Sequence, residues 1–238
     1  MSIGIVIPCY KESENISKLI NNINTNLKEV YLYIIDDSPD NQIEELIKDF
    51  DNVNYFKREK KLGRGSAVLF GIKKILEKKN INTVIEMDAD LSHDPFELKE
   101  NLKFFNKNQN DLLISSRYLK NSKIINWSIQ RLVFSYLSNK LAKFLLKVPV
   151  TDYTNGYRIY SKPAAEHIIK KCGKIGDGFI ILSEILVELY YNKFVVLETS
   201  SIFRNRVRGE SSVNFKEIVN SFIGLIKIYR IKTKLCRK

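Results

Sequence analysis

The chain has 238 residues, of which 44% are hydrophobic and 11% aromatic, an ordinary composition for one globular domain with a full core. Its 39 Lys and Arg against 27 Asp and Glu give a net charge of +12, which favours anionic partners such as nucleotides, nucleic acid or acidic lipid surfaces. Cys9, Cys172 and Cys236 are too widely spaced for a metal site or a disulfide framework, so we expect a reducing, cytosolic compartment. Charged residues interrupt every apolar run before the roughly 20 residues that span a bilayer, and we expect no signal peptide.

Short β-rich runs alternate with amphipathic helical patterns through the first half of the chain. This alternation predicts βαβ units around a mostly parallel sheet. Helical spacing is clearest at Ile16, Leu19, Ile20 and Ile23. The predicted strands are residues 3–8, 31–35, 53–56, 83–87 and 112–115. Polar clusters follow three of these strands, and open α/β sheets bind ligands beyond the carboxyl ends of their strands, so one site is expected at that edge.

The third polar cluster carries two carboxylates, Asp88 and Asp90, directly after the strand predicted at 83–87. Hard cations such as Mg²⁺ and Mn²⁺ prefer carboxylate oxygens and commonly share them with substrate phosphates. The spacing therefore favours a divalent cation site. A solvated acidic turn that caps the helix opening near Pro95 would produce the same pattern.

After Ser116 the pattern becomes more helical. We predict helices at 127–147 and 178–191, a Thr-, Asp- and Gly-rich loop at 152–156, and a strand at 194–203. An amphipathic helix at 217–231 ends in a basic cluster, which divides the chain into a main domain at 1–212 and a tail at 213–238. Such a tail either docks on the core or lies on an anionic membrane surface or against a membrane subunit.

Six motifs occur in the order seen in family 2 glycosyltransferases. They are residues 8–12, 36–40, 62–67, 87–95 (which contain Asp-Ala-Asp-Leu-Ser-His-Asp-Pro), 116–118 and 206–211. With Trp127 and Arg131, the chain resembles the dolichol-phosphate (polyprenyl-phosphate) mannosyltransferases of that family over residues 3–228. The resemblance implies a GT-A (Rossmann-like) nucleotide-diphospho-sugar transferase fold, with a mostly parallel central sheet flanked by helices.

The resemblance also assigns roles to individual positions. It implies Mg²⁺ or Mn²⁺ as cofactor, held by Asp88 and Asp90, with Ser92 contributing directly or through water. The residues implied in binding the nucleotide sugar are Pro8, Tyr10, Glu12, Asp36, Asp37, Gly63 and Asp88. Those implied at the acceptor phosphate are Arg117, Arg131 and Arg206, to which helical spacing adds Ser135. The expected catalytic set is Asp88, Asp90, Arg117, Arg131 and Arg206.

The implied reaction moves a hexose from a nucleoside-diphosphate sugar, GDP-mannose before UDP-glucose, to a polyprenyl phosphate, with inversion at the anomeric carbon. A lipid monophosphate is largely dianionic at pH 7, since its second pKa is about 6, so no general base is needed. Arginine forks that bind the phosphate are needed instead. The expected partners are the donor, the lipid, a membrane surface and, as a further candidate, a small membrane subunit, at the cytosolic face of a membrane.

Other interpretations remain open at this level. Asp36 and Asp37 also fit simple turn chemistry before Pro39, and each arginine fits an ordinary surface residue. A family 2 enzyme that transfers to a saccharide hydroxyl in cell-surface polysaccharide synthesis is the alternative function, and Ser212, where the family usually has Lys, mildly favours it. A nucleic-acid-binding module fits poorly because the basic residues are dispersed. A nucleotidyltransferase would not need the Trp127, Arg131 and Arg206 set. His93 is expected to be a hydrogen-bonded loop residue.

Overall fold

The structure is a computed structural model that describes residues 2–176, 178–205 and 215–237. In these residues a seven-stranded sheet has the order β3-β2-β1-β4-β7-β5-β8, and a small second sheet pairs β6 with β9. The strands are β1 Ser2–Cys9, β2 Val30–Asp36, β3 Val53–Lys57, β4 Ile81–Glu86, β5 Leu112–Ser116, β6 Lys123–Ile125, β7 Arg158–Ser161, β8 Val196–Ser200 and β9 Ile202–Arg204. The helices are α1 Ser13–Asn26, α2 Gln42–Ile47, α3 Arg64–Leu76, α4 Leu98–Lys107 after a short 3₁₀ turn Pro95–Glu97, α5 Ile129–Leu146, α6 Lys162–Lys171, α7 Ile180–Tyr191 and α8 Phe215–Leu235.

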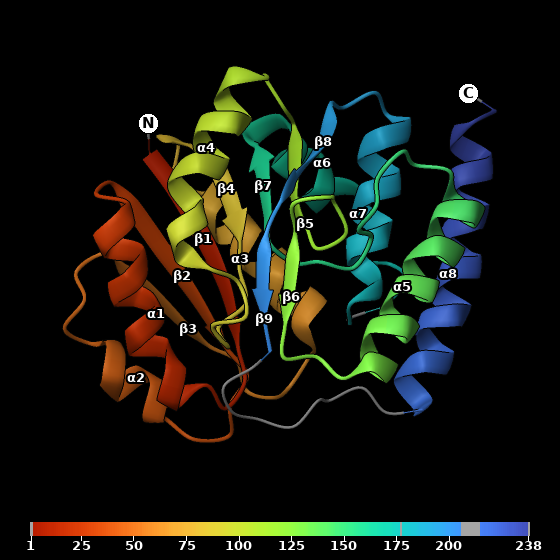
Figure 1. The fold of residues 1–238 in the computed structure, drawn as a ribbon. Helices are drawn as coiled ribbons and strands as arrows, with labels where there is room; N and C mark the ends of the chain where they lie inside the picture. Colours follow the sequence, from red (N-terminus) through yellow and green to blue (C-terminus); the bar gives the residue numbers. More distant parts are fainter. Residues whose placement is uncertain (1, 177, 206–214, 238) are drawn as a thin grey trace.

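The main sheet is mostly parallel, as the sequence predicts. Strands β1 to β4 run in one direction, β7 runs antiparallel between β4 and β5, and β8 pairs parallel with β5. The carboxyl ends of β1, β2, β4 and β5 therefore meet at one edge of the sheet, the lower edge in Figure 1. The polar clusters that follow these strands are brought together there.

Helices cover both faces of the sheet, so its central strands are almost continuously apolar. Alternate residues of β1 enter different layers: Ile5 and Ile7 pack with α1, α2 and α4, whereas Val6 packs with α3, α6 and α7. At the far side of the second layer, α5 and α8 lie side by side (Figure 1). No helix in the described part of the chain is both long enough and apolar enough to cross a bilayer.

The strand predicted at 194–203 is wrong as a single element, because it breaks at Ser201 into β8 and β9. The Ser201 hydroxyl donates to Glu97 (2.6 Å), and the Ile202 backbone N–H donates to the same carboxylate (2.7 Å). These bonds draw the chain out of the main sheet and into pairing with β6. The short elements β6, β7 and α2 were not predicted, and β4 ends one residue earlier than expected.

Helix α8 docks on the core along one face only. Ile228 is fully buried, and Gly224 lies so close to Ile180 that a Cβ there would come within 2.5 Å of its Cγ1. The opposite side exposes large apolar side chains, namely Phe222, Ile223, Ile226 and Tyr229. One face of the tail helix therefore docks on the core, which is the first of the two alternatives for the tail. The proposed division between 212 and 213 lies outside the described residues and stays a prediction.

Candidate active site

The first polar cluster at the sheet edge involves the carboxylates that follow β2. Asp36 is fully buried and accepts hydrogen bonds from the Tyr55 hydroxyl (2.9 Å) and Lys57 Nζ (3.0 Å). Asp37 accepts from the Arg58 guanidinium and from the Leu62 backbone N–H (3.0 Å). Both carboxylates thus order the loops around the predicted base pocket, and their contact with a nucleotide stays a prediction.

The residues predicted to bind the nucleotide after β1 form a more open surface. The Tyr10 ring is 38% exposed and has the Lys61 ammonium 3.7 Å from its centroid, while the Glu12 carboxylate accepts from Asn15 (2.9 Å). Gly63 precedes α3 with a φ of +92°, a conformation that favours glycine. Pro8 is near the end of β1, paired with Ile35 of β2. Together these residues line the same edge as Asp36 and Asp37.

The predicted metal-binding residues lie where β4 ends. Asp90 is buried and its Oδ1 accepts from the Ser92 backbone N–H (3.0 Å). Between them Leu91 has a φ of +60°, a strained conformation for a branched side chain of the kind that collects at functional sites. The Ser92 hydroxyl is buried with no hydrogen-bond partner among the described residues. Two carboxylates and this hydroxyl are oxygen donors of the kind that fit Mg²⁺ or Mn²⁺.

His93 is a hydrogen-bonded loop residue, as expected. Its Nδ1 accepts from the Asp88 backbone N–H (3.1 Å), and its Nε2 bonds to Asn155 Oδ1 (2.9 Å). Burial lowers the pKa of the imidazole, and the nearby Asp88 and Asp90 oppose that shift only in part. The ring stacks on Tyr157 (5.2 Å between centroids), so His93 stabilises the loop that carries Asp88 and Asp90.

Sequence reasoning missed an ion-pair network at Asp88. Arg64, the first residue of α3, donates through Nε to Asp88 Oδ1 (2.8 Å) and through Nη1 to Glu86 Oε1 (2.7 Å). Glu86 is fully buried and also accepts from the Tyr160 hydroxyl (2.7 Å). The available signals were a lone acidic residue in an apolar strand and an arginine within the motif at 62–67.

On the acceptor side, Arg117 follows β5 and pairs with Asp152. Its Nε and Nη2 bond to the two carboxylate oxygens at 2.7 Å each, and both side chains are buried. Burial alone lowers the pKa of Arg117, but the charge and hydrogen bonds of Asp152 outweigh it, so the pKa is raised. Burial likewise raises the pKa of Asp152, and Arg117 more than reverses this, so that the carboxylate keeps a lowered pKa.

Arg117 and Arg131 both lie against the ring of Trp127. The Arg131 guanidinium lies 3.9 Å from the Trp127 ring centroid and that of Arg117 lies 5.5 Å from it. Arg131 also donates to Asn205 Oδ1 (2.9 Å). The Ser135 hydroxyl, one turn along α5, bonds to the Tyr118 hydroxyl (2.6 Å). The structure thus brings together three of the four predicted acceptor residues.

The fourth predicted acceptor residue, Arg206, and Ser212 lie outside the described residues. Just before them, the Phe203 ring connects the metal side to the acceptor side. Its centroid is 5.5 Å from that of His93, 5.3 Å from that of Trp127 and 5.4 Å from the Arg117 guanidinium. The loop at 152–156 makes the same connection, since Asp152 binds Arg117 and Asn155 binds His93. The two sides therefore form one site.

The carboxylate of Glu184, on α7, orders a loop away from the site. Its carboxylate accepts from the backbone N–H groups of Gly173 (3.1 Å) and Lys174 (3.4 Å), and burial raises its pKa. Its contacts therefore order the chain after α6.

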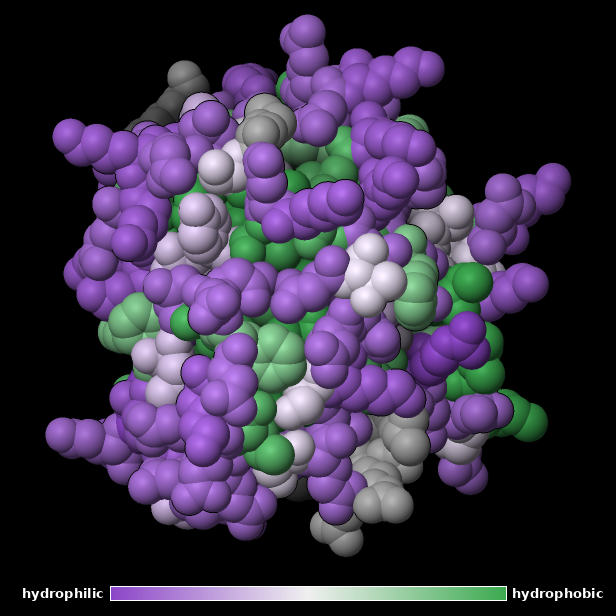
Figure 2. All heavy atoms as spheres, turned by 90° about the vertical axis from the view of Figure 1, so that its left-hand side faces the viewer, coloured by the Kyte–Doolittle hydropathy of each residue, from purple (hydrophilic) through white to green (hydrophobic). Residues whose placement is uncertain are grey.

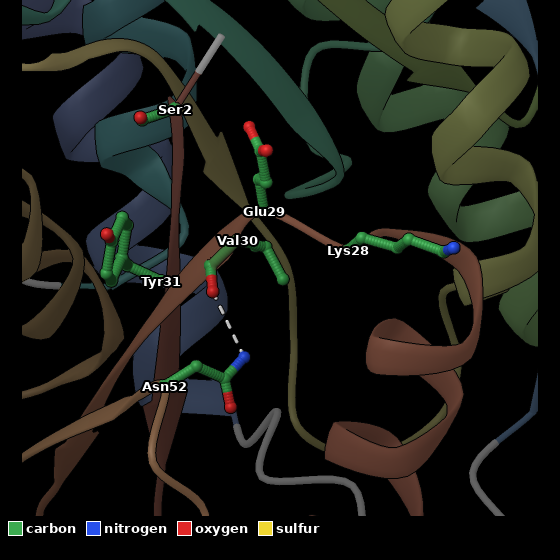
Figure 3. A pocket seen from close by; sticks show the side chains of 6 residues that line it. All are labelled: Ser2, Lys28, Glu29, Val30, Tyr31 and Asn52. Carbon is green, nitrogen blue, oxygen red and sulfur yellow. Dashed lines mark hydrogen bonds between the residues drawn. The ribbon is translucent and has the colours of Figure 1, made fainter.

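A surface pocket of about 380 Å³ lies at the opposite edge, beside the amino ends of β1 and β2. In Figure 3 the side chains of Lys28, Glu29 and Tyr31 point in different directions, and Asn52 donates to the Val30 carbonyl (3.0 Å). Because its polar groups do not converge, this pocket adds nothing to the site.

Sequence comparisons show the family to which the chain belongs. The profile described as "Glycosyl transferase family 2" matches residues 4–169. The chain is 32% identical over 219 residues to the polyprenol monophosphomannose synthase of Mycolicibacterium smegmatis, covering 90% of this chain and 82% of that protein. It is 33% identical to the dolichol-phosphate mannosyltransferase of Pyrococcus furiosus, covering 97% of this chain but only 64% of that longer protein. The chain belongs to family 2 of the glycosyltransferases.

Solved structures share the fold at low sequence identity. Glucosyl-3-phosphoglycerate synthase from Mycobacterium tuberculosis, in complex with Mn²⁺, UDP-glucose and phosphoglyceric acid, has a TM-score of 0.67 at 14% identity, covering 96% of this chain and 79% of that one. TarS 1–349 from S. aureus, in complex with UDP-GlcNAc, has a TM-score of 0.66 at 16% identity, covering 98% and 66%. These likenesses establish the predicted GT-A-like fold.

Proposed function

We propose that the protein transfers a hexose, mannose in preference to glucose, from a nucleoside-diphosphate sugar to the phosphate of a polyprenyl lipid. The names of the two relatives, a polyprenol monophosphomannose synthase and a dolichol-phosphate mannosyltransferase, support this substrate class. The observation that carries the proposal is that Arg117 and Arg131 both lie against Trp127, which Phe203 joins to the carboxylate loop. Asp152 offsets the charge of Arg117, so Arg131 supplies the positive charge that suits an anionic acceptor.

On the donor side, Asp88, Asp90 and Ser92 would hold Mg²⁺ or Mn²⁺. In the described residues no three His, Cys, Asp or Glu side chains gather as a metal cluster, so donor phosphates would complete the coordination. The ion, when bound, supplies positive charge that stabilises the departing diphosphate. Mn²⁺ with UDP-glucose in the fold relative from M. tuberculosis supports this cofactor. GDP-mannose is the donor favoured here.

The transfer is a single displacement with inversion. An oxygen of the lipid phosphate attacks the anomeric carbon, the bond from that carbon to the diphosphate oxygen breaks, and its electron pair leaves with the nucleoside diphosphate. No proton has to move, because the acceptor is already ionised. Arg131 holds the acceptor phosphate in line with the anomeric carbon. The part of the Arg117 guanidinium that does not bind Asp152 assists it. Ser135 adds a hydroxyl beside them.

Transfer to a saccharide hydroxyl, the alternative function, needs a general base at the acceptor. Asp152 is the carboxylate beside Arg117, and its pKa is held low by that arginine. A carboxylate with a lowered pKa is a weak base, so Asp152 is poorly suited to the general-base role that a hydroxyl acceptor requires.

We further propose that the protein works at the cytosolic surface of a membrane, either directly or through a small membrane subunit. The outer face of α5 supports this, because its exposed apolar side chains include Ile129, Val133, Leu137 and Phe144, the last 75% exposed. Helix α8, which packs against α5, also exposes large apolar side chains. By contrast, the face over α1, α2 and β3 is mainly hydrophilic (Figure 2).

The direct test incubates the purified protein and Mn²⁺ with labelled GDP-mannose or UDP-glucose and a short polyprenyl phosphate. We expect label in the organic phase from GDP-mannose, and its loss in the Asp90→Ala variant. Binding of the acceptor is read separately from the fluorescence of Trp127, the single tryptophan of the chain. A parallel incubation offers a soluble oligosaccharide in place of the lipid, and label transferred to that oligosaccharide with none in the lipid would favour the hydroxyl acceptor.

A further inference from the structure

Arg64 occupies the place between the two acidic residues at the end of β4. Its guanidinium donates hydrogen bonds to Asp88 Oδ1 through Nε (2.8 Å) and to Glu86 Oε1 through Nη1 (2.7 Å), while Nη2 lies 2.6 Å from Asp88 Oδ1 as an ion-pair contact without hydrogen-bond geometry. Asp88 is also a predicted metal ligand. One of the oxygens that a divalent cation would use is therefore already bound by a protein cation.

The surroundings fix this guanidinium in position. Glu86 is fully buried and held from its other side by the Tyr160 hydroxyl. Phe179 covers the guanidinium at 5.1 Å from its ring centroid. On the remaining side is Gly156, where an added Cβ would come within 1.9 Å of Arg64 Nη2. The absence of a side chain at 156 leaves the space that Arg64 fills.

We propose that Arg64 is a positioning residue that couples cation binding to donor binding at this site. While it pairs with Asp88 it orients and neutralises that carboxylate, and it competes with a divalent cation that arrives alone. A nucleoside diphosphate brings its own negative charges, which compensate both the cation and the guanidinium. Cation and diphosphate are then bound together much better than either alone. This inference rests on the proposed function, since it assumes a nucleoside-diphosphate donor.

The proposed coupling between cation binding and nucleotide binding predicts opposite changes in two measurable affinities. Removing the guanidinium takes a competitor from Asp88, so binding of the cation alone should tighten. It also takes a positive charge from the diphosphate, so the factor by which nucleotide and cation help each other should fall. A side chain with a purely structural role would weaken both kinds of binding, or neither, when removed.

The test measures Mn²⁺ binding by calorimetry and by electron paramagnetic resonance, alone and with saturating GDP or UDP. The variants are Arg64→Gln and Gly156→Ala, the second of which displaces the guanidinium without changing the charge. Lys73→Gln is the control, because Lys73 is an exposed cation on the same helix, nine residues further along. Retained thermal unfolding of each variant shows that it has folded.

We expect tighter binding of Mn²⁺ alone and a roughly tenfold smaller coupling factor in both test variants, with the control like the wild type. Unchanged coupling in folded Arg64→Gln protein, or weaker binding of Mn²⁺ alone, would overturn the inference while leaving the proposed function intact. Wild-type protein that binds no Mn²⁺ with either nucleotide would overturn the proposed donor site itself.

Discussion

Two regions of the molecule differ in the kind of surface that they present. One is the sheet edge at the carboxyl ends of β1, β2 and β4, which we call the donor edge because we propose that the donor binds there, and the other is the helix pair α5–α8. At the donor edge, charged groups are buried or partly buried and paired with one another, as in Asp37 with Arg58 and Asp88 with Arg64. On α5 the polar residues Arg131 and Ser135 face the site, whereas the outer face exposes large apolar side chains. The first arrangement suits a small, highly charged ligand. The second suits an amphiphile whose charged head enters the site while its apolar part stays outside.

Helical geometry explains how one helix meets both requirements. Arg131, Ser135 and Asn139 recur every fourth residue and so share the inward face. Val133 and Leu137 lie between these positions and share the outward face. Because the residues proposed to bind the phosphate and the apolar surface belong to the same helix, a membrane against that surface would bring lipid headgroups close to the site.

The largest effect is expected at the donor edge, from Asp90→Asn. The change keeps the shape of the side chain but removes the charge that would hold the cation, so transfer should fall about 10³-fold. Thermal unfolding should barely change. Asp51→Asn, at an exposed position, is the control, and near-normal transfer by Asp90→Asn would contradict the predicted metal role.

A second large effect, on the stability of the fold, is expected where Asp152 pairs with Arg117. Asp152→Asn leaves the buried Arg117 without its charged partner and should lower the free energy of unfolding by about 3 kcal/mol. Urea unfolding measures it, with the exposed Asp49→Asn as control.

The same substitution has a defined pH dependence. The folded-state pKa of Asp152 is lower than its ordinary value of 3.8, so its ionised form stabilises the fold at all pH values above about 4. This contribution is lost as the pH falls below 3.8 toward the lower folded-state pKa. The difference between wild type and Asp152→Asn should therefore be constant at neutral pH and shrink in acid. A difference that grows in acid would contradict the pairing.

A smaller, more selective effect is expected from Arg131→Gln. Its loss should raise KM for a short polyprenyl phosphate about tenfold and leave donor affinity unchanged, because its contacts are with Trp127 and Asn205 on the acceptor side. Steady-state kinetics measure KM for the acceptor, and a nucleotide-binding assay measures the affinity for the donor. Lys99→Gln removes an exposed charge from α4 as a control. An equal loss of donor affinity would place Arg131 elsewhere in the mechanism.

The smallest effect should be on membrane recovery. The double substitution Leu137→Gln with Phe144→Gln removes exposed apolar surface from α5 and should reduce flotation with vesicles of phosphatidylcholine and phosphatidylglycerol severalfold. Activity on a water-soluble acceptor should persist. Leu46→Gln on α2 is the matched control, since Leu46 is 45% exposed on the hydrophilic side. Unchanged flotation would remove α5 from the proposed membrane surface.

Much of the fold was predictable because the physical signals are local. The buried parallel strands read as apolar runs, and the helices between them show their apolar period. The elements that were missed are short or depend on distant partners: β7 has four residues between two antiparallel neighbours, and the break at Ser201 depends on Glu97. Such contacts over about 100 residues of sequence leave no local pattern.

The residue types at the candidate site could be predicted from the sequence, but the pairs that they form could be predicted only in part. The motif around Asp88 and the arginine positions could be recognised by resemblance. That Arg64 pairs with Asp88, and that Asp152 engages Arg117, could not be, because charge pairing is decided by packing across the sheet edge. The sequence shows which groups are present, whereas the structure shows which of them already have partners.

The most direct test of the account varies only the acceptor head group. Wild-type protein with Mn²⁺ and GDP-mannose is offered a short polyprenyl phosphate or the corresponding polyprenol, and products are identified by mass spectrometry. We predict a mannosyl phosphate product from the phosphate alone, with none from the alcohol. Transfer to the alcohol at a comparable rate would contradict the proposed phosphate-binding role of the arginines and the expectation that the acceptor needs no general base.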